Sequence, residues 1–443
     1  MTRIIIAASP IYGHVAPLCS VAAALVRKGY PVTFLTGSRF PFVQDTGARF
    51  VPLTGIADYD ASQVHRIPER NALPGGPPQL DYDFRHLFFD PIPIQHRALQ
   101  SLLAEAEAIA PDDPVVVLHD VAFLGTWPVL HGAAGIRPAG IVGLGIAPLT
   151  LTSVDTAPFG LGLEPDNSEA GRQRNRALNA KIVDEVFAGT QAHLRDVLRT
   201  VGAEEAAPFF FDGMVSVPDR YLQLSIEGLE YQRSDAPAGL RYIGALPPAA
   251  AAGPSALPAG WADKLGGKPV IVVTQGTVAN HDLEELIAPT LRALARLDVT
   301  VIALTGSTSD RLKAVPANAH VAEFVPFSEL LPRADILISN GGYGGVQQAL
   351  AHGVPLILAG ATEDKIEVNA RAAHTGAAIN LYIARPTELQ LRMAVQTMLE
   401  SADYRANARR LQREYARHDS LSAIVRTIEE FASEAVPVAA AVD

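Results

Sequence analysis

The chain has 443 residues, of which 48% are hydrophobic and 19% charged, and a formal net charge of -11. This length is generous for one domain and comfortable for two, and the composition argues against both a disordered chain and a membrane-spanning bundle. The acidic charge argues against nucleic acid as a partner, because no basic surplus is available to neutralise phosphates.

The single cysteine and the N-terminal residues bear on the location of the protein. Cys19 cannot form an internal disulfide, which favours a reducing, cytoplasmic setting. The N-terminus runs at once into the apolar segment Ile4–Ala8, which is too short for a secretory signal and is interpreted as a first strand. No apolar run is long enough to span a bilayer, so we expect no transmembrane segment. The oligomeric state is left open.

Short apolar runs rich in β-branched residues alternate with helical stretches along both halves of the chain. The predicted strands of the first half are Ile4–Ala8, Val32–Thr36, Val115–Leu118 and Ile141–Ile146. Those of the second half are Val270–Thr274, Val299–Leu304, His320–Phe324, Ile336–Ser339 and Leu356–Ala359. This alternation predicts two doubly wound α/β domains, each built on a parallel sheet.

Two kinds of segment interrupt the alternation. The proline- and alanine-rich stretch 247–255 suits an exposed connector, so we place the domains at 1–245 and 269–443 with a linker at 246–268. The last helix is a candidate to pack back on the first domain. Residues 56–97 and 153–214 are irregular, although a helical segment lies within the second stretch, and we interpret both as walls of a substrate pocket.

A histidine and an aspartate follow two predicted strands of the first half. His14 lies in a turn after the first strand, before a helix expected to begin near Pro17, and Asp120 follows Val115–Leu118. Ligands of open α/β sheets bind at the carboxyl ends of the strands, where these two residues could face each other. A carboxylate bonded to one imidazole nitrogen orients the other nitrogen to take a proton. The alternatives are a structural turn histidine and a helix-capping aspartate.

Two strand ends of the second half lead into glycine-containing turns that precede helices. They are Gln275-Gly276-Thr277 and Asn340-Gly341-Gly342-Tyr343-Gly344-Gly345. Glycine lets the backbone approach a ligand closely, and the N–H groups at a helix start bind anions, so these turns suit a diphosphate. Thr277 adds a hydroxyl donor. Tight packing is the alternative explanation of such turns.

The order of motifs in the second half resembles the donor-binding signature of family-1 glycosyltransferases. The motifs are Phe324-Val325-Pro326-Phe327, Asn340-Gly341-Gly342, Gln347-Gln348-Ala349-Leu350, Gly353-Val354-Pro355 and Glu363-Asp364-Lys365. Together with the Gly13-His14 turn, the resemblance covers nearly the full chain and is similar to bacterial macrolide and natural-product glycosyltransferases. It implies the GT-B fold, in which an N-terminal acceptor-binding and a C-terminal donor-binding domain, both Rossmann-like, face a cleft.

The resemblance implies a role for each matching residue. His14 matches the catalytic base of the family and Asp120 its partner. The implied donor contacts are Phe324 and Val325 for the nucleobase, Thr277, Asn340, Gly341, Gly342, Gly344 and Gly345 for the diphosphate, Gln348 for the ribose, and Asp364 and Lys365 for the sugar hydroxyls. Aromatic residues are expected to line the acceptor site. The candidates are Tyr12, Tyr82, Phe84, Phe88 and Phe159, with Tyr59, Phe89 and Phe209-Phe210-Phe211 as further ones.

Three positions depart from the family pattern. Asn340 stands where the family usually has histidine, which leaves diphosphate binding to the backbone. Gln348 replaces a glutamate and offers one carbonyl oxygen to the two ribose hydroxyls, so UDP and dTDP donors both stay open. Lys365 replaces a glutamine, which leaves the identity of the sugar open.

The segments Asp58-Tyr59-Asp60 and Asp81-Tyr82-Asp83 have the D-x-D form that another glycosyltransferase fold uses to hold a cation. Both fall in the irregular stretch, so we interpret them as solvated loop carboxylates and expect neither a metal nor another cofactor. The expected activity is an inverting, metal-independent sugar transfer from a UDP- or dTDP-sugar to a hydroxyl of a small apolar acceptor. The alternatives are a nucleotide-sugar epimerase and a catalytically silent protein that binds a nucleotide sugar.

Overall fold

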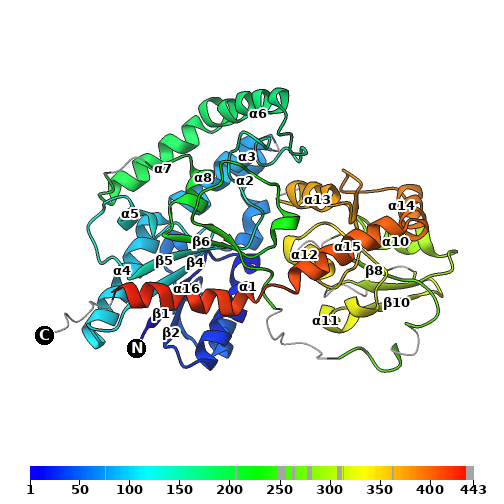
Figure 1. The fold of residues 1–443 in the computed structure, drawn as a ribbon, viewed down its shortest axis with the longest axis horizontal. Helices are drawn as coiled ribbons and strands as arrows, with labels where there is room; N and C mark the ends of the chain where they lie inside the picture. The colour runs from blue at the N-terminus through cyan, green and yellow to red at the C-terminus, as the bar shows by residue number, and fades with distance from the viewer. Residues whose placement is uncertain are drawn as a thin grey trace, which may run out of the picture.

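The computed structural model describes residues 1–74, 76–204, 207–247, 256–261, 265–276, 282–306, 312, 314–361 and 364–435. These residues form two α/β lobes, each built around one parallel sheet (Figure 1). The expected fold class, two doubly wound domains, is confirmed. None of the helices in this described part combines the length and the apolar character that a membrane crossing requires.

The first sheet has seven parallel strands in the order β3-β2-β1-β4-β5-β6-β7. They are β1 (Arg3–Ala7), β2 (Val32–Thr36), β3 (Arg49–Pro52), β4 (Val115–Asp120), β5 (Gly140–Gly145), β6 (Arg220–Gln223) and β7 (Leu240–Tyr242). The central strands are continuous buried runs, as expected where helices cover both faces of a parallel sheet. The sequence pattern missed β3, β6 and β7, because strands of three or four residues carry little periodicity.

The first lobe contains eight α-helices among the residues described, together with shorter helical turns. They are α1 (Tyr12–Arg27), α2 (Pro68–Asn71), α3 (Pro77–Asp83), α4 (Ile92–Ile109), α5 (Trp127–Leu130), α6 (Glu169–Lys181), α7 (Ala188–Thr200) and α8 (Phe210–Ser216). Shorter 3-10 or π-helical turns are η1 (Pro41–Thr46), η2 (Gly55–Ala57), η3 (Ala61–Arg66), η4 (Phe84–Phe89), η5 (Ile182–Val186) and η6 (Glu227–Leu229).

The expectation that α1 begins near Pro17 is wrong, because the helix begins at Tyr12 and contains Pro17. The backbone N–H groups of His14 and Val15 already donate to the carbonyl oxygen of Ile11. The irregular stretch 56–97 is largely helical. Pro68 and Pro77 occupy the first positions of α2 and α3, where a missing N–H costs nothing.

The second sheet has six parallel strands in the order β10-β9-β8-β11-β12-β13. They are β8 (Val270–Thr274), β9 (Thr300–Leu304), β10 (Ala319–Ala322), β11 (Ile336–Ser339), β12 (Leu356–Leu358) and β13 (Ala378–Asn380). The helical segments that follow in the chain are α10 (Ile287–Leu294), α11 (Phe327–Leu330), η8 (Leu331–Arg333), α12 (Tyr343–Ala351), α13 (Lys365–His374), α14 (Glu388–Glu400), α15 (Ala402–Tyr415) and α16 (Ser420–Ala435).

The helix α16 follows the second lobe in the chain but packs on the first sheet, where Figure 1 shows it in red. Its residues Ile424, Ile428 and Phe431 share one apolar core with α1 and with the strands β1 and β4. The contact with the sheet is close, because a Cβ on Gly140 at the start of β5 would lie 2.3 Å from the Phe431 ring. One face of the first sheet is thus closed by α1 and α16 together.

Each sheet has one point where the strand order reverses. In the first sheet this point lies between β1 and β4, which pair from Arg3 to Ala7, and in the second between β8 and β11. Connections leave such a pair of strands toward opposite faces, so the space beyond their carboxyl ends is the usual ligand site of a doubly wound sheet. The candidate residues lie at these strand ends: His14 follows β1, Asp120 is the last residue of β4, and Asn340 follows β11.

Candidate active site

His14 and Asp120 meet at the switch point of the first sheet. Asp120 is the last residue of β4, and His14 lies in the first turn of α1, which follows β1. The His14 Nδ1 atom lies 2.6 Å from Asp120 Oδ1. Asp120 is fully buried, whereas the His14 side chain is 20% exposed. The structure therefore brings the two predicted catalytic residues together.

Backbone groups fix the carboxylate of Asp120. Its Oδ2 accepts the N–H of Ser9 at 2.7 Å, and its Oδ1 accepts the N–H of Ala122 at 2.8 Å. These donors compensate for the removal of a charge from water. With the carboxylate ionised, Nδ1 of His14 carries the proton of the pair, and Nε2 is left to accept another. This arrangement can orient an imidazole as a general base.

A neutral side chain bridges the switch point of the second sheet. Asn340 directly follows β11, and its Nδ2 donates to the carbonyl oxygen of Gln275, which follows β8, at 2.7 Å. Asn340 therefore links the ends of β11 and β8. The family that the sequence resembles usually has histidine at this position. Thr277, predicted to contact the diphosphate, lies outside the described residues.

We call residues 340–345, which are predicted to bind the diphosphate, the diphosphate turn. This turn is tightly packed on one side and open on the other. Gly341 has φ +95°, and a Cβ there would lie 1.8 Å from Asn369 Oδ1. A Cβ on Gly342 or Gly344 would meet nothing within 4 Å, and one on Gly345 has a single neighbour at 3.8 Å. The first backbone N–H groups of α12 have no acceptor within the helix. The turn therefore offers an anion a helix start with room beside it.

The predicted nucleobase platform lies just beyond the carboxyl end of β10. Phe324 is 43% exposed, whereas Val325 is buried in the core of the second lobe. An exposed aromatic ring at the ligand edge suits stacking on a nucleobase. Gln348, the predicted ribose contact, lies in the second turn of α12, is partly exposed, and makes no side-chain hydrogen bond within the part of the chain that is described.

The predicted sugar-binding pair forms the start of α13. Asp364 is the N-cap residue, and Lys365 is the first residue of the helix and is buried. The segment before α13 approaches the diphosphate turn closely, since a Cβ on Gly360 would lie 1.9 Å from the Asn340 carbonyl oxygen and 3.1 Å from Lys365 Cδ. Gly360 therefore lies between the Asn340 backbone and the Lys365 side chain, and Asp364 directly precedes Lys365 in the chain.

The predicted acceptor phenylalanines all join one aromatic cluster. The ring centroid of Phe84 lies 5.4 Å from that of Phe88 and 4.6 Å from that of Phe210, and Phe159 lies 5.6 Å from Phe211. Phe89, Phe210 and Phe211 are buried and belong to the core, so their assignment to the acceptor site is wrong, whereas Phe84, Phe88 and Phe159 are partly buried at the margin of the cluster. Phe84, Phe88 and Phe159 thus form one apolar wall.

The predicted tyrosines lie apart from this cluster. The Tyr82 ring contacts that of His86 in a tilted arrangement, with the centroids 4.4 Å apart. Tyr12 is 47% exposed, with its ring 6.2 Å from that of Phe42. Burial, and then the negative charge of the Asp120 carboxylate, raise the pKa of Tyr59. Its hydroxyl is buried and has no hydrogen-bond partner among the described residues.

The interpretation of the D-x-D segments as solvated loop carboxylates is wrong for 81–83, which lies in α3, whereas 58–60 lies in the loop between η2 and η3 with its aspartates partly exposed. Asp60 pairs with Arg39 at 2.6 Å, and Asp83, which lies in α3, accepts two hydrogen bonds from Arg70 at 2.6 and 2.8 Å. Arginine partners neutralise these carboxylates and hold them in place. In the described ranges, no group of three or more His, Cys, Asp or Glu side chains is arranged to hold a metal ion.

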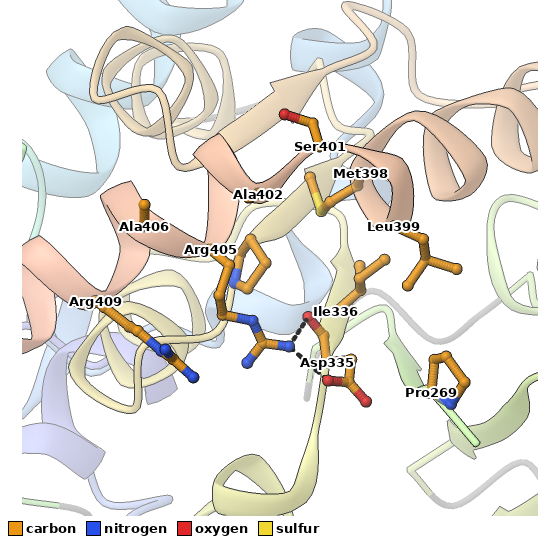
Figure 2. Close-up of a pocket in the computed structure, with 11 residues that line it drawn as sticks. Pro269, Asp335, Ile336, Met398, Leu399, Ser401, Ala402, Arg405, Ala406 and Arg409 are labelled. Atoms are coloured by element: carbon orange, nitrogen blue, oxygen red, sulfur yellow. Dashed lines mark hydrogen bonds and ion pairs between the residues drawn. The ribbon is translucent and has the colours of Figure 1, made fainter. Parts of the chain in front are cut away.

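A cavity of about 410 Å³ lies at the opposite, amino edge of the second sheet (Figure 2). Pro269 and Asp335, which precede β8 and β11, line it. Arg405 of α15 donates to the carbonyl oxygen of Asp335 at 2.9 Å and to its carboxylate at 2.6 Å. Ligands of doubly wound sheets bind at the carboxyl edge, so this cavity is separate from the candidate site.

Sequence patterns did not reveal a buried polar network between the lobes. The hydroxyl of Tyr343, in the diphosphate turn, accepts from Gln223 Nε2 at 3.0 Å and donates to Glu230 Oε1 at 3.2 Å. Arg371 of α13 donates to Glu230 Oε2 at 2.8 Å. Each bond joins residues from different lobes, so no local spacing marks them.

Comparison with known proteins extends these observations. The family model of the erythromycin biosynthesis protein CIII-like C-terminal domain matches residues 288–431. The chain is 44% identical over 440 residues to UDP-glycosyltransferase 2 of Phaeomoniella chlamydospora, covering 97% of this chain and 96% of the relative. It is 38% identical over 430 residues to 4'-demethylrebeccamycin synthase of Lentzea aerocolonigenes, covering 96% of this chain and 99% of the relative.

Solved structures share the fold over nearly the whole chain. The glycotransferase of kitacinnamycin superposes with a TM-score of 0.71 at 22% identity, over 97% of this chain and 99% of that one. The glycosyltransferase VinC, solved in complex with dTDP, superposes with a TM-score of 0.66 at 19% identity, over 98% of this chain and all of that one.

Proposed function

This chain belongs to the family-1 glycosyltransferases with the GT-B fold, and we propose that it moves a sugar from a UDP- or dTDP-sugar to a hydroxyl of a small apolar acceptor, with inversion and without a metal. The observation that carries the proposal is the 2.6 Å contact between His14 and Asp120 at the ligand edge of the first sheet. The names of its relatives support the donor and acceptor classes, since they include a UDP-glycosyltransferase and the synthase of a natural product.

The proposed reaction is a single displacement at the anomeric carbon of the donor sugar. The acceptor oxygen attacks this carbon while Nε2 of His14 takes the hydroxyl proton, and the bond from the carbon to the diphosphate oxygen breaks on the opposite side. Asp120 stabilises the imidazolium that forms. One in-line displacement inverts the anomeric configuration, and the nucleoside diphosphate leaves with the electron pair.

Preorganised donors at the second switch point replace a metal in this proposal. The N–H groups at the start of α12 stabilise the negative charge that develops on the leaving diphosphate, and the family resemblance assigns the Thr277 hydroxyl to the same diphosphate. Phe324 stacks on the nucleobase, and Asp364 with Lys365 binds the sugar. The wall of Phe84, Phe88 and Phe159 favours an apolar acceptor, because its exposed margin offers aromatic surface.

Product analysis tests the whole proposal. The purified chain is incubated with UDP-glucose, a flavonol and excess chelator, and the product is identified by mass spectrometry and by the coupling constant of its anomeric proton. We expect a β-glucoside from the α-linked donor, at the same rate with and without the chelator. An α-glucoside would contradict inversion, and a rate that chelator abolishes and magnesium or manganese restores would contradict the metal-free mechanism.

A further inference from the structure

Two glycines of the first lobe are fastened to the start of α13 in the second lobe. Gly160 and Gly162 both donate their backbone N–H groups to Glu367 Oε1, each at 2.8 Å. Their φ values are +97° and +60°, and a Cβ on Gly162 would lie 2.5 Å from Ile366 Cγ2. The segment thus approaches α13 in a way that favours glycine at both positions. Glu367 is the third residue of the helix whose start carries the proposed sugar-binding pair.

A buried arginine balances the charge of Glu367. Arg371, one turn further along α13 and only 1% exposed, donates to the other carboxylate oxygen of Glu367 and, at 2.8 Å, to Glu230. It also donates to the carbonyl oxygen of Leu149 at 3.0 Å, and its guanidinium lies 4.6 Å from the ring centroid of Tyr231. Glu230, Leu149 and Tyr231 belong to the first lobe, so Arg371 is held from both sides.

The charges in this cluster depend on one another. Burial alone would raise the pKa of Glu230, but Arg371 and then Arg233 outweigh burial and lower the pKa below its ordinary value. Burial alone would lower the pKa of Arg371, and the carboxylates of Glu230 and Glu367 raise it instead. Removing one member of such a cluster leaves another charge buried without its partner.

The cluster touches both proposed substrate sites. Phe159, directly before Gly160, belongs to the aromatic wall proposed for the acceptor. On the donor side, Glu230 accepts a hydrogen bond from the hydroxyl of Tyr343, which lies in the diphosphate turn, at 3.2 Å. A single hydrogen-bonded path therefore runs from the diphosphate turn, through Glu230, Arg371 and Glu367, to the segment next to the acceptor wall.

We infer that Glu367 and Arg371 are positioning residues, which align the acceptor with the donor sugar by fixing residues 159–162 on the sugar-binding end of α13. We call this assembly of residues 159–162, Glu367 and Arg371 the clasp. The inference rests on the proposed function of the two sites that the clasp joins. Neither side chain is assigned a contact with the reacting atoms; the clasp acts through geometry, and a misplacement of about 1 Å costs roughly a hundredfold in rate.

The variant Glu367→Gln tests the clasp. The amide keeps one acceptor oxygen, loses the charge that pairs with Arg371, and turns N–H groups toward the guanidinium. With saturating UDP-glucose and a flavonol acceptor, we expect kcat/KM for the acceptor to fall by about 10- to 100-fold. The Kd for UDP, measured by calorimetry, should stay within about twofold of the wild type.

Two further variants separate positioning from mere stability. Glu414→Gln is the matched control, because Glu414 of α15 also accepts a backbone N–H from the first lobe, that of Gly228 at 2.8 Å, but lies outside the clasp. It should leave acceptor kinetics unchanged. Gly162→Ala forces the strained φ and the contact with Ile366, so it should reproduce the loss of Glu367→Gln, and the two losses should not add.

The kinetics are compared at a temperature where circular dichroism shows every variant to be folded. If Glu367→Gln does not fold, the kinetics of Gly162→Ala take its place as the test of the clasp. Wild-type acceptor kinetics in Glu367→Gln, an equal loss in Glu414→Gln, or a parallel loss of UDP affinity would overturn the clasp. A wild-type chain that makes no glycoside would instead contradict the proposed function, so the two failures are distinguishable.

Discussion

The two switch points of the molecule are bridged in the same place by different chemistry. In the first lobe the bridge joins His14 to Asp120, and in the second the Asn340 amide donates to the carbonyl oxygen of Gln275. The first pair can change its protonation state, whereas the second cannot and leaves the open start of α12 beside it. The same point of a doubly wound sheet can thus support proton transfer or anion binding, depending on whether its bridge is titratable.

The largest effect is expected from removing the titratable bridge. His14→Ala should lower the rate of transfer to an alcohol by about 10²- to 10⁴-fold, because the general base is lost. The affinity for UDP should be nearly unchanged, because the diphosphate is assigned to the other switch point. Steady-state kinetics and calorimetry measure the two quantities, and near-normal turnover would show that His14 is only a structural turn residue.

A smaller loss is expected from Asp120→Asn. The amide can still position the ring but cannot stabilise the imidazolium, and adding this change to His14→Ala should alter the rate little because the two residues act as one unit. Stability should also fall by about 1–3 kcal/mol, since one amide oxygen replaces two that accept from Ser9, Ala122 and His14. Additive losses in the double variant would separate the pair.

At the second switch point, two neighbouring glycines should respond differently. Gly341→Ala should destabilise the fold by about 1–2 kcal/mol, because φ is +95° and the new Cβ would overlap Asn369. The new Cβ in Gly342→Ala meets no atom within 4 Å, so the melting temperature of this variant should stay near that of the wild type. Because the methyl group occupies the space assigned to the diphosphate, UDP affinity should fall about tenfold, or about 1.4 kcal/mol. Unchanged UDP affinity in Gly342→Ala would argue that the diphosphate lies elsewhere.

The smallest effect concerns the ribose. Gln348 offers a single carbonyl oxygen, so it should discriminate the 2′-hydroxyl weakly, and dTDP should compete with UDP. Competition binding should give a preference for UDP of less than roughly a hundredfold, or about 2.7 kcal/mol. A larger preference would mean that Gln348, or a neighbouring group, recognises the ribose more strongly than its chemistry suggests, and Gln348→Glu is the variant to compare.

The sequence predicted the sheets well for a physical reason. Buried parallel strands are continuous apolar runs, so the predicted bounds of Val270–Thr274 and Ile336–Ser339 match the structure. The pairing of His14 with Asp120 could be anticipated because residues that end neighbouring central strands meet at one edge. What the sequence did not indicate is that Asn340 bonds to a backbone carbonyl, since its partner is defined only by the turn after β8.

The buried charges between the lobes were beyond the reach of pattern analysis. Glu367 and Arg371 are four positions apart in a helix, the spacing of an ordinary exposed ion pair. Here, however, both are buried, and Glu230 and the Gly160 backbone of the first lobe pack against them. In the sequence, Tyr343 is likewise only one residue of a glycine-rich turn. It links the two lobes because its hydroxyl donates to Glu230 of the first lobe. Long-range partners have no local signature.

The position of α16 has a consequence for how the protein is made. Its residues Ile424, Ile428 and Phe431 complete the core of the first lobe, yet they follow the whole second lobe in the chain. Domains commonly fold in order as they leave the ribosome, N-terminal first. Until the second lobe has been synthesised, α1 covers its part of this face of the first sheet, but the part that α16 covers stays exposed, so the core of the first lobe is completed only when the end of the chain arrives.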